Sequence, residues 1–152
     1  MKILLIDIDS KIPNLALMKI SSFYKQYGCE VVLNNYLFNA DKAYMSKIFL
    51  ESKIDYPKEV EIGGSGYNLK IKLPEEIEHI TPDYSLYNCS YSIGFVTRGC
   101  PKNCGFCVVP EKEGNIKFNA NLSEFVRHKK VKLLDANFLA YKDCIDIMKE
   151  II

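Results

Sequence analysis

The stretch KILLIDIDSKIPNLALMKISSFYKQYGCEVVL (residues 2–33) decides the fold. Its first part, residues 2–7, is short and almost continuously apolar, as expected of a parallel strand covered on both faces. Residues 14–27 repeat apolar side chains at helical spacing, and Gly28 stands where a helix C-terminal cap belongs. Residues 29–33 form a second apolar run. A strand, a helix and a strand in this order predict a βαβ unit, with a parallel sheet and a right-handed crossover.

The rest of the chain continues this alternation. Strands are expected at Ala43–Leu50 and Glu59–Ile62, and the second of these runs into Gly63-Gly64-Ser65-Gly66. The second half predicts a strand at Tyr91–Thr97, a helix with a capping-box-like start at Asn121–His128, a strand at Val131–Asp135 and an amphipathic helix at Tyr141–Ile152. The pattern therefore predicts an α/β protein.

The overall composition excludes several functional classes. A hydrophobic share of 48% and a charged share of 26% are typical of a soluble globular protein. The net charge of +1 predicts no clear nucleic-acid surface and no attraction to acidic membranes. No apolar stretch approaches the roughly 20 residues of a membrane span, and acidic residues follow the N-terminus too soon for a signal peptide. We therefore expect a cytoplasmic protein without membrane partners, whose six cysteines are metal ligands or buried thiols.

Three cysteines stand close together in the segment Cys100–Cys107, with the spacing CxxxCxxC and Phe106 before the last cysteine. Thiolates are the usual ligands of iron–sulfur clusters, which normally use four. Three cysteines can hold three irons of a cubane cluster and leave the fourth iron open to a substrate. The segment follows a predicted strand directly, where α/β folds place their active sites.

The cysteine spacing is also compatible with other kinds of metal site. Zinc would take tetrahedral Cys₃His or Cys₄ ligation, and a purely structural or electron-transfer cluster would recruit a distant fourth cysteine. Candidates for the fourth ligand are His79, Cys89, His128 and Cys144. Cys29 and Cys144 read as buried small hydrophobic residues, whereas Cys89 is ambiguous.

The segments FVTRGC (residues 95–100) and CVVP (residues 107–110) resemble the signature of the radical S-adenosylmethionine (radical SAM) superfamily. The resemblance is closest to the branch with a cobalamin-binding-type domain before the barrel. It implies that Cys100, Cys104 and Cys107 ligate a 4Fe–4S cluster whose open iron is chelated by S-adenosylmethionine. One electron then cleaves this cofactor to methionine and a 5′-deoxyadenosyl radical, with a reductant such as flavodoxin or ferredoxin as partner.

The same resemblance supplies further cofactor-binding candidates. It places Phe106 beside the adenine of S-adenosylmethionine. Residues 134–138 (LDANF) end the next strand, where the family contacts the amino group of that cofactor. This chain departs there from the family's Gly-Gly-Glu form, so Asp135 and Asn137 are candidates beside the alternative of a strand-end turn. No catalytic side chain is identified.

The N-terminal residues 1–80 resemble the cobalamin-binding-like Rossmann domain of such proteins, and residues 81–90 form a connection. Cobalamin binders of this fold use an Asp-x-His-x-x-Gly loop, but Ser10 and Lys11 follow Asp9 and no histidine is near. We therefore expect no cobalamin there. The Gly63–Gly66 segment could cradle a phosphate, but a sharp turn after a strand is the better interpretation.

Residues 91–152 then correspond to the first βα units of a partial (β/α) barrel. Only 45 residues follow Cys107, although even small β/α barrels occupy roughly 200. The sequence thus predicts a fragment of a radical SAM enzyme or a naturally short form, incomplete for turnover by itself. The CVVP segment also resembles methylthiotransferases, which modify transfer RNA or a ribosomal protein, but the three further cluster cysteines of those enzymes are missing. The substrate is unknown.

Overall fold

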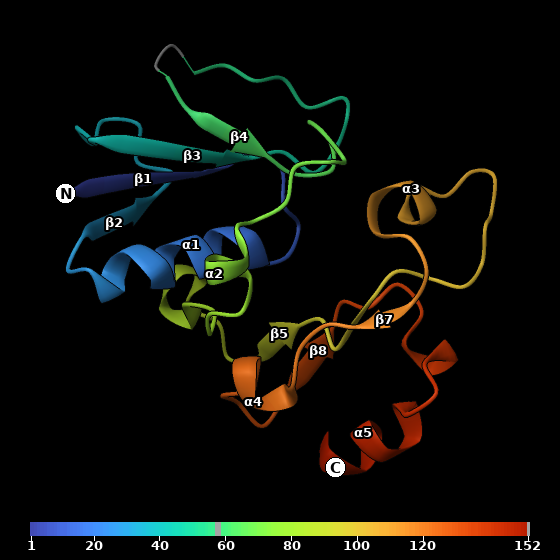
Figure 1. Cartoon of the computed structure of the whole chain (residues 1–152). Helices are drawn as coiled ribbons and strands as arrows, with labels where there is room; N and C mark the ends of the chain where they lie inside the picture. The colour runs from blue at the N-terminus through green and yellow to red at the C-terminus, as the bar shows by residue number, and fades with distance from the viewer. Residues whose placement is uncertain (57–58, 152) are drawn as a thin grey trace. The chain divides into compact units, whose positions relative to one another are not determined.

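The structure is a computed structural model that describes residues 1–56 and 59–151. It divides into two compact units, Met1–Cys89 and Ser90–Ile152 (Figure 1). None of the helices in these described ranges is long and apolar enough to cross a membrane.

The first unit is built on a four-stranded sheet in the order β2-β1-β3-β4, and all its neighbours are parallel. The strands are β1 (Lys2–Asp7), β2 (Glu30–Leu33), β3 (Lys42–Ser46) and β4 (Glu61–Gly63). The helix α1 (Leu15–Gln26) connects β1 to β2 (Figure 1). The predicted βαβ unit and the parallel α/β sheet are therefore confirmed.

Local signals set both ends of α1. The Asn14 side chain accepts a hydrogen bond from the Leu17 N–H at 3.2 Å and caps the N-terminus. At the other end Gly28 has φ +70°, its N–H donates to the Lys25 carbonyl, and the Cys29 N–H donates to the Tyr24 carbonyl. This pair of bonds is a Schellman motif, and it confirms Gly28 as the residue that ends the helix.

Alternate side chains of β1 belong to two separate apolar clusters, one on each face of the sheet. Ile3 and Leu5 pack with α1 and with Ile77 of α2 (Glu75–Glu78). Leu4 and Ile6 pack with Ala43 and Met45 of β3. These four β1 side chains are fully buried, which explains why the strand reads as a continuous apolar run.

Residues 81–89 follow α2 and belong to the first unit, where they contact α1 and the end of β1. The Asp83 carboxylate accepts hydrogen bonds from the Ser21 hydroxyl at 2.6 Å and from the Lys25 ammonium at 2.7 Å, both on α1. The 3₁₀ helix η1 (Tyr84–Tyr87) then brings the Tyr87 hydroxyl to the Asp7 carboxylate at 2.6 Å. The segment predicted as a connection thus ties α1 to the end of β1.

The second unit combines one parallel and one antiparallel strand pair. Strands β5 (Ser92–Gly94) and β8 (Val131–Leu133) are parallel, whereas β6 (Thr97–Arg98) and β7 (Lys117–Phe118) are antiparallel. The helical elements are α3 (Val109–Glu113), α4 (Leu122–Phe125), the 3₁₀ helix η2 (Phe138–Ala140) and α5 (Cys144–Ile151). The β5–α4–β8 order is the βα repeat that the sequence predicts.

Several strand predictions were too long, and the one at Val131–Asp135 ends at Leu133 in β8. The strand expected at Tyr91–Thr97 divides into β5 and β6, because the N–H groups of Val96 and Thr97 donate to the Asp135 carboxylate instead of continuing the β8 ladder. The strand expected at Ala43–Leu50 ends at Ser46, because the N–H groups of Ile48 and Phe49 donate to Asp9 at 2.8 and 2.9 Å. The strand predicted at Glu59–Ile62 is found at Glu61–Gly63.

Two helix predictions were also too long. The Glu124 carboxylate accepts the Asn121 N–H at 2.8 Å, as a capping box requires, but α4 ends at Phe125. Beyond it the N–H groups of residues 127 and 128 donate to the Ser92 hydroxyl at 2.8 and 2.9 Å. The last helix begins at Cys144 because η2 and an extended Tyr141 precede it, and its predicted end at Ile152 lies outside the described residues.

Candidate metal centre

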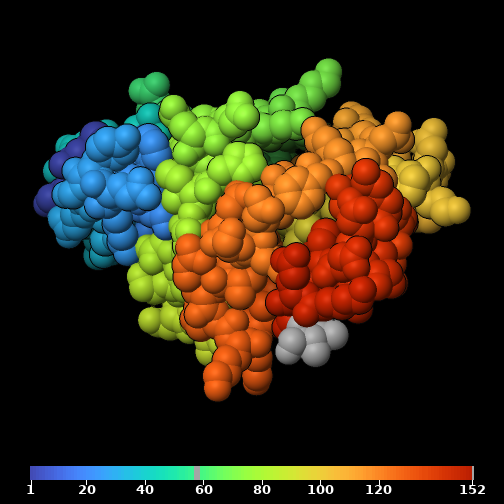
Figure 2. Space-filling model, turned by 60° about the horizontal axis from the view of Figure 1, so that its bottom comes forward, coloured from blue at the N-terminus to red at the C-terminus, as the bar shows by residue number. Residues whose placement is uncertain are grey.

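The three closely spaced cysteines lie on the long connection between β6 and β7 in the second unit. This connection includes α3 and stands out from the rest of the unit in the ribbon (Figure 1). Figure 2 shows its yellow and gold surface projecting beyond the orange and red surface of the same unit. The connection, residues 99–116, is called the cysteine loop below.

The two ends of the cysteine loop are joined by side-chain and backbone bonds. The Glu113 carboxylate accepts the Gly99 N–H at 3.0 Å and the Arg98 guanidinium at 3.1 Å. The Cys100 N–H donates to the Gly114 carbonyl at 3.1 Å. These bonds continue the short β6–β7 ladder into the loop, so Gly99 and Cys100 are held at its entry.

Cys100 is half-buried, and two N–H groups point at its sulfur. The Asn137 amide donates to the Cys100 Sγ at 3.4 Å, and the Lys102 backbone N–H donates to it at 3.5 Å. These two bonds lower the pKa of the Cys100 thiol from its ordinary value, the Asn137 bond most strongly. A thiol that ionises more readily is a better metal ligand, because the thiolate is the coordinating form.

Cys104 and Cys107 are exposed on the outer part of the loop. The Cys107 N–H donates to the Cys104 carbonyl at 3.0 Å, which makes a turn between them, and the Phe106 ring beside them is 93% exposed. Within residues 1–56 and 59–151, no three side chains of His, Cys, Asp or Glu lie close enough to hold a metal ion. Three thiols on one loop are suitable ligands for an iron–sulfur cluster. For all three to bind one cluster, however, the outer loop has to move.

Asp135 acts on the chain segment that leads into the cysteine loop. One carboxylate oxygen accepts the Val96 N–H at 3.2 Å, and the other accepts the Thr97 hydroxyl at 2.6 Å as well as the Thr97 N–H. Both oxygens are engaged by residues 96 and 97. In the structure Asp135 therefore makes long-range hydrogen bonds to the strand that leads into the loop, and not the local turn that the sequence offered as the alternative to cofactor binding.

The four candidates for a fourth ligand are divided between the units. Cys89 and the exposed His79 belong to the first unit, and His128 and Cys144 belong to the second. Cys144 is buried and its thiol lies 3.6 Å from the Leu139 carbonyl oxygen, as expected of a small hydrophobic residue. Cys29 and Cys89 are half-buried in the first unit, and burial raises the pKa of Cys89. The Nδ1 atom of His128 lies 3.2 Å from the Ser92 hydroxyl oxygen. None of the four candidates therefore joins Cys100 in a described metal-holding group.

In the first unit the Gly63–Gly66 segment forms a turn, as predicted. The Tyr67 N–H closes it on the Gly64 carbonyl at 3.0 Å, and the Gly66 N–H donates to the Lys47 carbonyl at 3.0 Å. Gly64 has φ +102°, and a Cβ there would lie 2.2 Å from the Lys47 carbonyl oxygen. At Gly66 a Cβ would lie 2.5 Å from the Phe49 carbonyl oxygen, so close packing against the chain after β3 requires glycine at positions 64 and 66.

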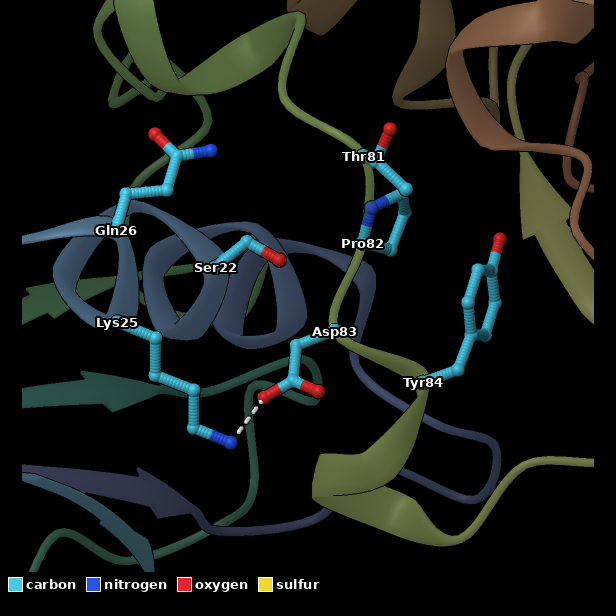
Figure 3. A pocket seen from close by; sticks show the side chains of 7 residues that line it. All are labelled: Ser22, Lys25, Gln26, Thr81, Pro82, Asp83 and Tyr84. Atoms are coloured by element: carbon cyan, nitrogen blue, oxygen red, sulfur yellow. Dashed lines mark hydrogen bonds and ion pairs between the residues drawn. The ribbon is translucent and has the colours of Figure 1, made fainter.

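An open hollow lies on the first unit beside α1. Figure 3 shows the side chains that line it, which are Ser22, Lys25 and Gln26 of α1 and residues 81–84. Among these side chains, the Lys25 ammonium forms an ion pair with the Asp83 carboxylate at 2.7 Å. Burial alone would raise the pKa of Asp83, but the hydrogen bonds from Lys25, Ser21 and Ser85 outweigh it and lower the pKa. The hollow therefore presents a satisfied ion pair, which has a structural role.

The sequence did not single out the residues that close the loop. Arg98 and Glu113 are 15 positions apart, and the guanidinium also lies over the Phe95 ring at 3.6 Å. The one available signal was the Glu113-Gly114 pair after a short helical stretch, since Gly114 takes φ +73° and allows the chain to turn back.

A comparison with known proteins found a CDK5RAP1-like protein of Oryza sativa subsp. japonica, which is 30% identical to this chain over 99 residues. The match covers 59% of this chain and 16% of the relative, so the chain spans a small part of that relative's length. No protein-family model matches the chain. No solved structure matches it either.

Proposed function

We propose that this chain is a radical SAM enzyme, or a part of one, and that its cysteine loop holds a 4Fe–4S cluster. The observation that carries the proposal is the state of Cys100. It is fixed at the closed end of the loop with two N–H donors on its sulfur, while Cys104 and Cys107 lie accessible on the same loop. Hydrogen bonds to cluster sulfurs are a recognised means of tuning such centres.

The roles of the side chains follow from their positions. Cys100, Cys104 and Cys107 would be the three ligands. A cluster held by them would supply one-electron chemistry, the reductive cleavage of S-adenosylmethionine. The exposed Phe106 ring is available to stack on the adenine of that cofactor. Asn137 would orient Cys100, and Asp135 would hold the strand that leads to it.

The rice relative supports the same proposal. Its CDK5RAP1-like name points to the methylthiotransferase type of radical SAM enzyme, and the CVVP segment resembles that type too. The substrate and the reaction subclass stay open in this proposal. The electron would come from a small cytoplasmic donor such as flavodoxin or ferredoxin.

The first unit would be the cobalamin-binding-like Rossmann domain of this architecture. Its sheet order β2-β1-β3-β4 places the reversal of strand order between β1 and β3, where open α/β sheets bind ligands. Asp7 and Asp9 lie at that edge, but Asp7 accepts from Tyr87 and Asp9 accepts from Ile48 and Phe49. Neither Asp7 nor Asp9 is followed two positions later by a histidine, so the proposal includes no cobalamin ligated by histidine.

The test is anaerobic reconstitution of the chain with iron and sulfide, followed by visible absorbance and by EPR with and without S-adenosylmethionine. We expect charge-transfer bands and an EPR spectrum that changes when S-adenosylmethionine is added. The Cys104→Ala variant should lose the cluster, whereas Cys29→Ala, in the first unit, should keep it. A colourless chain that takes up one zinc ion per molecule would replace this proposal with a non-catalytic zinc module. A cluster whose EPR ignores S-adenosylmethionine would indicate electron transfer instead.

A further inference from the structure

The neck of the cysteine loop, defined by Arg98, Gly99, Glu113 and Gly114, is an arrangement that the proposed ligands do not explain. Glu113 is the last residue of α3, and its side chain is 15% exposed. One of its oxygens accepts the Gly99 N–H and the other accepts the Arg98 guanidinium. A single carboxylate at the exit of the loop thus binds two successive residues at its entry.

Beside this carboxylate the backbone of the loop entry and the backbone of the loop exit lie so close together that position 99 has no space for a side chain. Gly99 has φ +82°, and a Cβ at this position would lie 2.6 Å from the Gly114 carbonyl oxygen and 2.3 Å from that of Asn115. The two chain segments therefore cross in direct backbone contact. The Cys100 N–H donates to the same Gly114 carbonyl at 3.1 Å. The first cysteine is locked by its own backbone where the segments cross.

The neck divides the three thiols into one fixed and two movable groups. Cys100 lies at the crossing, whereas Cys104 and Cys107 are exposed several residues away on the outer loop. Gathering three thiols around one centre costs loop-closure entropy, and this cost falls when the ends of the loop are already joined. A loop with a closed neck only has to fold its tip toward Cys100.

We propose that Glu113 is the positioning residue of this site, and that its carboxylate closes the neck and sets Cys100 before the metal binds. This inference rests on the proposed function, because it assigns Glu113 a role in building the cluster site. Glu113 does not touch a thiol itself, and it acts through the backbone of Gly99 and Cys100. Residues that orient metal ligands in this way typically change metal affinity by about 10- to 100-fold when they are replaced.

The experiment compares Glu113→Ala and Glu113→Gln with Glu111→Ala, a control that removes an exposed carboxylate from the same helix. Hydrogen exchange on the metal-free chain should show that the Gly99 and Cys100 amides lose protection in Glu113→Ala. After anaerobic reconstitution, the cluster of that variant should be lost to a chelator about 10- to 100-fold faster than in the wild type. Glu113→Gln keeps an acceptor for the Gly99 N–H and should recover part of the difference.

The outcomes separate this inference from the proposed function. If the wild type reconstitutes a cluster and Glu113→Ala keeps it as long as Glu111→Ala does, Glu113 has no positioning role. If the wild type forms no cluster, the proposed function fails and this inference fails with it. Thermal unfolding controls for a purely structural effect. A positioning role requires that Glu113→Gln loses its cluster faster than the wild type while its melting temperature equals that of the wild type. A Glu113→Gln variant with wild-type cluster retention and wild-type amide protection would overturn the role of the charged carboxylate.

Discussion

The Thr97 hydroxyl donates to the Asp135 carboxylate at 2.6 Å, and this bond joins β6, which enters the cysteine loop, to the segment that follows β8. Thr97 is fully buried, and its N–H and that of Val96 use the same carboxylate. One side chain thus satisfies three donors from two successive residues. Because these three donors share Asp135 as their acceptor, the contribution of Asp135 to stability can be measured without a metal.

We expect Asp135→Ala to destabilise the second unit by about 1–3 kcal/mol, because buried donors lose their acceptor. Thr97→Val removes only the hydroxyl donor and should cost less, about 1 kcal/mol. Urea unfolding followed by fluorescence or circular dichroism measures both values on the metal-free chain. Equal stability of Asp135→Ala and wild type would show that the carboxylate is not needed to hold the strand.

Asn137 offers a test of the sulfur contact in the second unit. Its amide is the main cause of the lowered pKa of the Cys100 thiol, so Asn137→Ala should raise that pKa. The pH at which alkylation of Cys100 reaches half its maximal rate should then move upward in the metal-free chain. Peptide mass spectrometry after brief iodoacetamide treatment measures this at each pH. Asn103→Ala, which changes an exposed amide of the loop, is the control, and the same upward shift there would contradict a specific contact.

The first unit was predictable because its determinants are local. The helix α1 carries its own signals, with Asn14 before its first turn and Gly28 after its last. The four central residues of β1, Ile3 to Ile6, are all apolar because neighbouring side chains are buried on opposite faces. Short-range patterns of this kind fix the type of each element, and the parallel pairing of β1 with β2 follows from the βαβ connection.

The neck of the cysteine loop was not predictable for the opposite reason. Its bonds connect residues about 15 positions apart, and Asp135 reaches Thr97 across 38 positions. Such contacts depend on how the chain folds back, which residue types alone do not encode. The cysteine spacing predicts three ligands, and this stays a prediction, because among the described residues the three thiols do not form a metal-holding group. The directions of these thiols depend on the loop conformation. Long-range bonds also explain why the helix predicted at residues 121–128 is shorter in the structure, since the N–H groups of residues 127 and 128 donate to the Ser92 hydroxyl.

The Asp83 carboxylate should give the first unit a pH-dependent stability. Its pKa is lowered in the folded chain, because the bonds from Lys25, Ser21 and Ser85 outweigh the effect of burial. A lowered folded pKa stabilises the fold above the unfolded value of about 4, and this contribution disappears as the pH falls through the folded pKa. Asp83→Asn should therefore melt at a lower temperature than wild type at pH 7. The two melting temperatures should converge at acidic pH, and a gap that persists unchanged at pH 2 would contradict the assignment.

Gly94 at the end of β5 lies against the ring of Phe125, and this contact leaves no space for a methyl group. A Cβ at Gly94 would lie 2.4 Å from two atoms of the ring, which is 3% exposed. Gly94→Ala should therefore destabilise the second unit by about 1–3 kcal/mol through overpacking. Gly105→Ala, where a Cβ meets nothing within 4 Å, is a matched control that should change little. If the clash is the cause, Phe125→Leu in the Gly94→Ala background should cost less than Phe125→Leu alone. Additive free energies of unfolding in this double-mutant cycle would show that the two sites are independent and would exclude the clash.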